Sequence, residues 1–175
     1  MPPTVDLFEK MLLPHLGAAY NLARWLTHNA HDAEDVVQES YLKALRSFHT
    51  FRVEADGRAW LLKVVRNTFY TWLQRNRDHR LSTNLADEPQ YADGASLDPE
   101  AVLIKAASLE SVHKALKDLP LEYREVLVLR EFEGFSYKQI AEISDLPIGT
   151  VMSRISRARR DLRARLSDAA QKVGQ

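Results

Sequence analysis

The chain has no cysteine among its 175 residues. Disulfide scaffolds, thiolate metal sites and cysteine nucleophiles are therefore excluded. No apolar run approaches the ~18–20 residues that span a bilayer. The N-terminal Met-Pro-Pro-Thr-Val-Asp lacks the basic segment and apolar stretch of a secretory signal. We therefore expect a cytoplasmic protein with no direct insertion into a membrane.

The usual signatures of enzymes and cofactor sites are also missing. The sequence contains no glycine-rich phosphate loop and no Ser/His/Asp motif. His28 and His31 are three residues apart and close to Asp32, Glu34 and Asp35, but the helical pattern places no third or fourth ligand beside them. We expect no enzymatic activity, no cofactor, no metal and no small-molecule substrate.

The chain also has no net charge, because 24 basic side chains balance 24 acidic ones. The charges are nevertheless unevenly placed. Residues 58–80 hold six basic side chains and one acidic, and residues 151–175 hold seven basic and two acidic. Residues 81–100, between them, hold five acids and no base. Two basic segments suggest two polyanion-binding surfaces on two modules, and ordinary solvated helix faces are the alternative.

Strand signals are nearly absent, and helical periodicity runs through most of the chain. In the N-terminal half, apolar residues repeat at three- and four-residue steps over 8–26, 32–48 and 61–72. Pro14 predicts a kink or a helix start within the first of these stripes. Residues 50–57 have the composition of a loop.

In residues 81–97 the periodicity fails and Asn, Asp, Pro, Gly and Ser accumulate, which predicts a flexible acidic linker. Asp98-Pro99 then supplies a helix start, and the stripe that follows stops at Pro120. Another helix is expected over 121–133, with Gly134 ending it. The sequence thus predicts an all-α fold of two small helical domains.

The segment after Gly134 has the pattern of a helix-turn-helix. Ser136 and Gln139 form a capping box that opens a short helix over 137–144. Asp145-Leu146-Pro147 breaks that helix, and a second one is expected over 148–166. Asp145 stands where the turn needs a left-handed backbone, which aspartate tolerates better than most residues.

The second helix has one apolar stripe and one polar, arginine-rich face. Val151, Ile155, Ala158 and Leu162 form the stripe. Arginines on the other face, near the helix N-terminus, suit the major groove, because a guanidinium can donate two hydrogen bonds to one guanine. We favour DNA, and the alternative is a basic helix that packs on a membrane or an acidic partner.

Several of these segments resemble the extracytoplasmic-function (ECF) group of bacterial RNA polymerase sigma factors. Residues 136–143 (SYKQIAEI) and 146–154 (LPIGTVMSR) resemble sigma region 4, and 119–127 (LPLEYREVL) fits it as well. Residues 32–39 (DAEDVVQE) look like region 2.2, and 58–67, from Arg-Ala-Trp-Leu-Leu to Arg-Asn, look like regions 2.3–2.4.

The resemblance implies a dissociable polymerase subunit that directs promoter recognition. Residues 1–80 would be region 2, 81–97 the linker and 98–175 region 4. The implied partners are core RNA polymerase, through the clamp helices of its largest subunit and the flap of the second-largest, promoter DNA, and an anti-sigma factor. The protein would be cytoplasmic, and the anti-sigma factor could tether it at the inner membrane. The promoters it serves would belong to a stress or envelope response.

The resemblance also implies which residues of this chain would contact polymerase and DNA, from the positions that match the family's motifs. The clamp helices would contact Asp35, Gln38 and Glu39. The −10 element would contact residues in or near the 51–57 loop, a pocket for a flipped base, and in the helix after it: Phe51, Arg52, Arg58, Arg66, Asn67, Arg75 and Arg77. Trp60 and Trp72 are interpreted as core residues more than as stacking platforms.

The −35 element would face the second helix of the helix-turn-helix. The residues expected there are Thr150, Met152, Ser153, Arg154, Ser156, Arg157 and Arg160. Met152 cannot donate a hydrogen bond, so it would contact a thymine methyl group. Two other functions stay open. One is a stand-alone helix-turn-helix regulator, and the other is a sigma-like mimic that binds a sigma regulator without binding DNA.

Overall fold

The computed structural model describes residues 3–77 and 109–173. Every regular element within these ranges is helical, which confirms the all-α fold class. The expected linker over 81–97 and the helix start at Asp98-Pro99 lie outside the described residues. We call residues 3–77 the N-terminal module and residues 109–173 the C-terminal module.

The N-terminal module begins with two helices, α1 (Pro3–Leu12) and α2 (Leu16–Thr27). A single 3₁₀ turn over Leu13–His15 separates them. Pro14 lies in this turn, at the position where its ring and its missing N–H are tolerated. The break expected at this proline is therefore a turn between two helices.

Two longer helices complete this module. Helix α3 (Ala30–Ser47) begins two residues earlier than expected, because the Asn29 side chain caps it by accepting a 2.9 Å hydrogen bond from the Asp32 N–H. A 3₁₀ turn (Phe48–Thr50) and the expected loop lead to α4 (Gly57–Arg75). The apolar stripes of α2, α3 and α4 pack together, and most of their large side chains are fully buried.

The C-terminal module starts with a helical stretch over residues 109–117, followed by α7 (Leu121–Leu127). The expected helix over 121–133 does continue, but its last part, Val128–Phe132, has π-helical hydrogen bonds. Gly134 ends it with φ +71°, a left-handed conformation that glycine adopts without strain.

The last two helices are α8 (Tyr137–Ser144) and α9 (Ile148–Val173). Helix α9 extends past the predicted end at Leu166. Residues 167–173 contain helix-forming Ala, Gln and Lys and neither Gly nor Pro, so nothing stops the helix at Leu166. Among the described residues, no helix is both long and apolar enough to cross a membrane.

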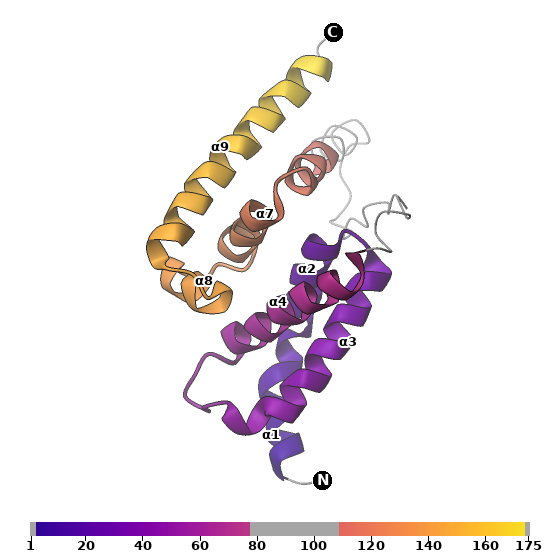
Figure 1. Cartoon of the computed structure of the whole chain (residues 1–175), viewed down its shortest axis with the longest axis vertical. Coiled ribbons are helices and arrows are strands. Elements are labelled where there is room, and N and C mark those ends of the chain that lie inside the picture. The colour runs from indigo at the N-terminus through magenta and orange to yellow at the C-terminus, as the bar shows by residue number, and fades with distance from the viewer. Residues whose placement is uncertain (1–2, 78–108, 174–175) are drawn as a thin grey trace, which may run out of the picture.

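The two modules pack against each other (Figure 1). Helix α4 lies beside α8, and α2 lies beside α7, while α9 runs along the outer side of the C-terminal module. One apolar cluster contains buried side chains from both modules, among them Phe69 and Ile143. This arrangement brings the basic helix α4 against the start of the helix-turn-helix.

Candidate nucleic-acid and polymerase interfaces

Local capping positions the helix-turn-helix, as the sequence predicted. The Ser136 Oγ accepts a 3.1 Å hydrogen bond from the Gln139 N–H, and the Gln139 side chain accepts one of 2.9 Å from the Ser136 N–H. At the other end of α8, Asp145 has φ 52°, and its N–H donates to the carbonyl oxygen of Ala141. Both ends of α8 are thus fixed, which sets the direction in which α9 leaves the turn.

Helix α9 separates a buried stripe from an exposed polar face. Val151, Ile155 and Ala158 are buried, as the periodicity predicted. Five of the seven residues expected to face the −35 element are exposed, and the other two, Thr150 and Arg154, are half-buried. The exposed five are Met152, Ser153, Ser156, Arg157 and Arg160. A polar helix face of this kind, held on a rigid turn, can enter a major groove.

The residues expected to contact core polymerase lie on α3. Asp35 and Gln38 are exposed, whereas Glu39 is half-buried and bonds to Lys43 at 2.8 Å and to Arg75 at 2.7 Å. Burial raises the pKa of the Glu39 carboxyl, but these two cations outweigh it and leave the pKa below its ordinary value. Arg75, expected at the −10 element, is therefore engaged with α3 in this conformation.

The loop before α4 has an aromatic base. Phe51 is buried and stacks on Phe48 with ring centroids 5.4 Å apart, and Trp60 lies 5.2 Å from Phe51. Trp72 is buried against Phe69, in line with the core interpretation, whereas Trp60 is only half-buried. Among the other −10 candidates, Arg52, Asn67 and Arg77 are exposed. Phe51 thus packs under the loop with Phe48 and Trp60, and the accessible −10 candidates are spread from the loop to the end of α4.

A cavity of about 290 Å³ opens between this loop and α8. Asp56, Trp60 and Lys63 line its N-terminal side, and side chains of α8, including Glu142 and Ile143, line the other. The Asp56 side chain caps α4 and also accepts a 3.1 Å hydrogen bond from the Gln139 side chain. The C-terminal module therefore contacts the end of the loop at which a flipped −10 base was expected, while residues 52–56 of that loop are exposed.

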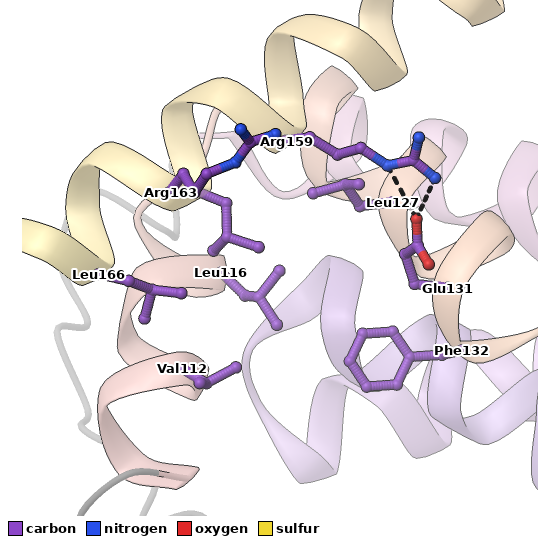
Figure 2. Close-up of a pocket in the computed structure, with 9 residues that line it drawn as sticks. Val112, Leu116, Leu127, Glu131, Phe132, Arg159, Arg163 and Leu166 are labelled. Atoms are coloured by element: carbon purple, nitrogen blue, oxygen red, sulfur yellow. Dashed lines mark hydrogen bonds and ion pairs between the residues drawn. The ribbon is translucent and has the colours of Figure 1, made fainter.

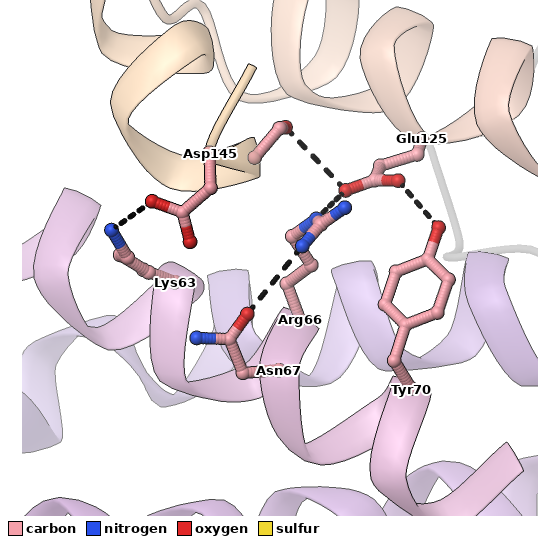
Figure 3. Close-up of polar contacts among 7 residues, drawn as sticks. Lys63, Arg66, Asn67, Tyr70, Glu125 and Asp145 are labelled. Atoms are coloured by element: carbon pink, nitrogen blue, oxygen red, sulfur yellow. Dashed lines mark hydrogen bonds and ion pairs between the residues drawn. The ribbon is translucent and has the colours of Figure 1, made fainter. Parts of the chain in front are cut away.

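Ion pairs on α4 also join the two modules (Figure 3). Arg66 pairs with Glu125, whose side chain is 1% exposed, and the hydroxyl of Tyr70 donates a 2.8 Å hydrogen bond to the same carboxylate. Lys63 donates to Asp145 at 2.7 Å. The sequence marked Arg66 as a DNA contact but gave no sign of Glu125, because the partners are 59 residues apart.

Arg58, also expected at the −10 element, is engaged with the C-terminal module. Its guanidinium pairs with the Glu133 carboxylate, donates a 2.7 Å hydrogen bond to the Glu133 carbonyl oxygen and lies 4.6 Å from the centre of the Phe135 ring. The Glu133 side chain is 6% exposed. Two of the seven −10 candidates, Arg58 and Arg66, thus pair with acids of the C-terminal module, and a third, Arg75, pairs with Glu39 of its own module.

The Tyr70 hydroxyl lies within the contact between α4 and α7. Burial and the neighbouring Glu125 carboxylate raise the pKa of the Tyr70 hydroxyl, while the charges of Arg66 and Arg154 act in the opposite direction. The Tyr70 side chain is half-buried. The effect of Arg154 on this pKa places the charge of that residue, a member of the expected −35 face, near the N-terminal module.

A second feature that the sequence did not point to is an apolar groove on the C-terminal module (Figure 2). It has a volume of about 330 Å³ and lies between α9, α7 with its π turn, and the helical stretch 109–117. Leucines such as Leu116 and Leu162 form its floor, and Phe132, 53% exposed, stands at one end. Arg163 lies along α9 at its edge, and Arg159 is tied to Glu131.

Comparison with known protein families covers both modules. Residues 11–79 match the family described as sigma-70 region 2, and residues 109–162 match sigma-70, region 4. The region 2 match accounts for the N-terminal half, which a stand-alone helix-turn-helix regulator leaves unexplained.

Individual relatives agree. The RNA polymerase sigma-H factor of Pseudomonas aeruginosa is 34% identical over 158 residues, 87% of this chain and 82% of that one. The ECF RNA polymerase sigma-E factor of Haemophilus influenzae is 38% identical over 144 residues, 79% of this chain and 75% of that one.

Two solved structures have similar folds. The sigma factor RpoE of Bartonella quintana, solved with the anti-sigma factor NepR, has a TM-score of 0.73 and 34% identity over 91% of this chain and 96% of that one. CnrH, solved with the cytosolic domain of CnrY, has a TM-score of 0.63 and 27% identity over 93% of this chain and 88% of that one. With both sigma regions present in order, the chain belongs to the sigma-70 family as an ECF sigma factor, a subunit that directs RNA polymerase to promoters.

Proposed function

We propose that this sigma factor reads the −35 element with the exposed face of α9 and the −10 element with the 51–57 loop and α4. The observation that carries this proposal is the division of α9 into a buried stripe and an exposed face. Val151 and Ile155 are held in the core, while Ser156 and Arg157 stand in solvent on a helix with a fixed N-terminal turn. Base-edge readout needs such a rigidly held, accessible face.

Run-off transcription with purified core polymerase on genomic promoter fragments is the direct test. We expect start sites that appear only when this protein is added and whose upstream sequences share −35 and −10 elements. If the protein binds DNA but not core polymerase, the assignment of residues 32–80 fails and a regulator function replaces it. If it binds core polymerase and no fragment is transcribed specifically, the −10 and −35 assignments fail.

We infer that the clamp helices of the largest polymerase subunit bind α3 through Asp35 and Gln38, together with Glu39, which directly follows Gln38. The exposure of Asp35 and Gln38 supports this, as does the engagement of Glu39 with Lys43 and Arg75, which holds that carboxylate in place. The variant Asp35→Ala should weaken binding to core polymerase. Glu9→Ala, which removes an exposed acid from α1, is the matched control and should not.

The flap of the second-largest subunit is assigned to the apolar groove of the C-terminal module. The groove has the apolar floor that an amphipathic helix requires, and Arg163 at its edge suits an acidic residue on that helix. Leu166→Asp places a charge in the groove and should reduce affinity for core polymerase. Ala164→Asp adds the same charge at an exposed position of α9, near the groove in sequence, and should have little effect.

Control by an anti-sigma factor is the last part of the proposal. The Bartonella quintana relative was solved with one, and it matches 91% of this chain. Such a partner would hold this sigma factor in the cytoplasm or at the inner membrane until a stress signal releases it. Co-purification of a partner from the native cell, lost when the signal is applied, tests this; a sigma factor that is always free in unstressed cells contradicts it.

A further inference from the structure

The first turns of α9 carry no charged side chain. Residues 148–153 read Ile-Gly-Thr-Val-Met-Ser, and the first cation of the helix is Arg154. Arg154 is half-buried, and its charge acts on the Tyr70 hydroxyl of the N-terminal module. A recognition helix contacts base edges with its N-terminal residues. The part of α9 best placed to reach base edges therefore offers no charged group.

Two large apolar side chains are exposed on this stretch. Ile148 is 49% exposed and Met152 is 50% exposed, although burial of either would be favourable. They are four residues apart, so they lie next to each other on one side of the helix. Val151 and Ile155, on the core side of the same helix, are at most 1% exposed. Ile148 and Met152 thus form an apolar pair outside the core, beside the exposed polar face.

The polar group nearest to this pair is used within the helix. The Ser153 Oγ donates a 2.9 Å hydrogen bond to the carbonyl oxygen of Gly149. Ser153 can therefore accept a hydrogen bond from a base, but its own proton is already engaged. The other exposed side chains of residues 148–153 are those of Ile148 and Met152, which have no donor. In this conformation the start of α9 has apolar contact to offer instead of hydrogen-bond donation.

The glycine between these residues is not required by the chain's own structure. The φ angle of Gly149 is not positive, and a Cβ there would have no neighbouring atom within 4 Å outside its own helix turn. Glycine within a helix lowers stability relative to alanine. The open space at this position lets the start of α9 approach a partner more closely than a side chain would allow.

The C5-methyl group of thymine is the apolar group that base pairs present in the major groove. We propose that Ile148 and Met152 bind thymine methyl groups, so that the −35 element of this sigma factor carries A·T pairs at two neighbouring positions that face the start of α9. The sequence suggested such a contact for Met152 alone, and the exposure of Ile148 beside it adds the second. This inference rests on the proposed assignment of the −35 element to α9.

Selection of promoters by the holoenzyme identifies these positions. Holoenzyme assembled from core polymerase and the full chain is given a promoter library in which the −35 positions are randomised. We expect A·T pairs to be enriched at two neighbouring positions. Enrichment of G·C pairs throughout the −35 element overturns the inference alone. If no −35 sequence is enriched, the proposed −35 function of α9 fails, and this inference fails with it.

Uracil then tests the methyl group itself. Replacement of thymine by uracil removes the methyl group and keeps the hydrogen-bonding groups of the base. At each of the two positions, this replacement should weaken holoenzyme binding about fourfold, the effect of one buried carbon group. If the selected element binds equally well with uracil, methyl recognition is overturned while the sigma assignment stands.

Truncated side chains connect each methyl group to the residue that binds it. Met152→Ala should weaken binding to the thymine promoter and remove the uracil effect at one position, and Ile148→Ala should do so at the other. Both residues are exposed, so these changes spare the core. Leu13→Ala truncates a 48% exposed leucine of the N-terminal module and should respond to uracil as the parent does. A full uracil effect in both α9 variants overturns the proposal.

Gly149→Ala tests the close approach of α9 to the bases. Alanine favours the helix more than glycine does, so the Tm of the free protein should be unchanged or higher. Binding of the holoenzyme to the selected −35 element should nevertheless weaken, because the added methyl group would lie between the helix and the base edges. Unchanged binding would mean that the start of α9 does not lie against the bases, which overturns the proposal.

Discussion

The hydroxyl of Tyr70 on α4 donates a 2.8 Å hydrogen bond to the carboxylate of Glu125 on α7, across 55 residues of sequence and between two sigma regions. The same carboxylate pairs with Arg66 and lies 3.5 Å from the hydroxyl of Ser144. Glu125 therefore has a partner for both oxygens although it is 1% exposed. A buried charge that is fully paired in this way stabilises only the conformation that supplies all its partners.

Removing the Glu125 carboxylate should strongly destabilise the closed protein. Glu125→Ala leaves Arg66, whose side chain is 16% exposed, without its anion, and breaking a buried pair on one side costs about 3–5 kcal/mol. Glu131→Ala breaks the exposed pair with Arg159, and such pairs contribute about 0–1 kcal/mol. Urea unfolding of both variants, followed by circular dichroism, measures the difference; equal losses would contradict a special role for Glu125.

Loss of the capping box should weaken α8. Ser136→Ala removes the hydroxyl that accepts from the Gln139 N–H, and such substitutions cost about 1 kcal/mol. Ser167→Ala removes a hydroxyl that only bonds the carbonyl of Arg163 within exposed α9, and it serves as the control. Thermal unfolding should show a lower Tm for Ser136→Ala than for Ser167→Ala. The same Tm in both would mean that α8 is held by packing alone.

Substitutions on the exposed face of α9 should change sequence preference. If Arg157 donates to a base edge, Arg157→Ala costs about 1–3 kcal/mol on the preferred −35 sequence and relaxes the preference at one position. Arg165→Ala, an exposed arginine farther along α9, is the control. Competition binding of the holoenzyme to promoters with single −35 changes measures both. A uniform loss on every sequence would make Arg157 a phosphate contact.

Acid should loosen the contact between the modules through His113. This side chain packs against Trp25 of α2, with the ring centroids 4.9 Å apart and the ring planes tilted by 37°. Burial, together with the charges of Arg24 and Lys117, lowers the pKa of His113 below its ordinary value. A pKa that is lowered in the packed conformation means that His113 takes up a proton more readily when the two modules are apart. The stabilisation of the contact between the modules is therefore complete above the ordinary histidine pKa of about 6.5, and it is lost as pH falls from there through the lowered pKa of His113.

The efficiency of fluorescence energy transfer between dyes attached at Asn21→Cys on α2 and Lys138→Cys on α8 should accordingly fall as pH is lowered below about 6.5. His113→Phe keeps an aromatic ring beside Trp25 and has no proton to gain, so its efficiency should stay constant over this range. His49→Phe, an exposed histidine of the N-terminal module, should behave like the parent. If His113→Phe responds to pH as the parent does, another group is responsible.

The sequence by itself determined the local structure. Capping at Ser136, the left-handed turn at Asp145 and the buried stripe of α9 all depend on neighbours within a few residues, so spacing and residue type were sufficient to predict them. Helix ends were predicted less well. Helix α3 begins earlier than predicted because Asn29 offers a cap before Asp32, and α9 continues past Leu166 because no breaker follows. Shifts of this size at a helix end cost little free energy.

Only the tertiary structure decided what the basic residues do. Periodicity placed Arg58 and Arg66 on a polar face, and that pattern is the same whether the face meets water, phosphate or a carboxylate. Their partners, Glu133 and Glu125, are 75 and 59 residues away, and no local rule connects side chains at that separation. Packing of α4 against α7 and α8 brings the opposite charges together. Some of the basic residues of the N-terminal module are therefore neutralised by acidic residues of the C-terminal module.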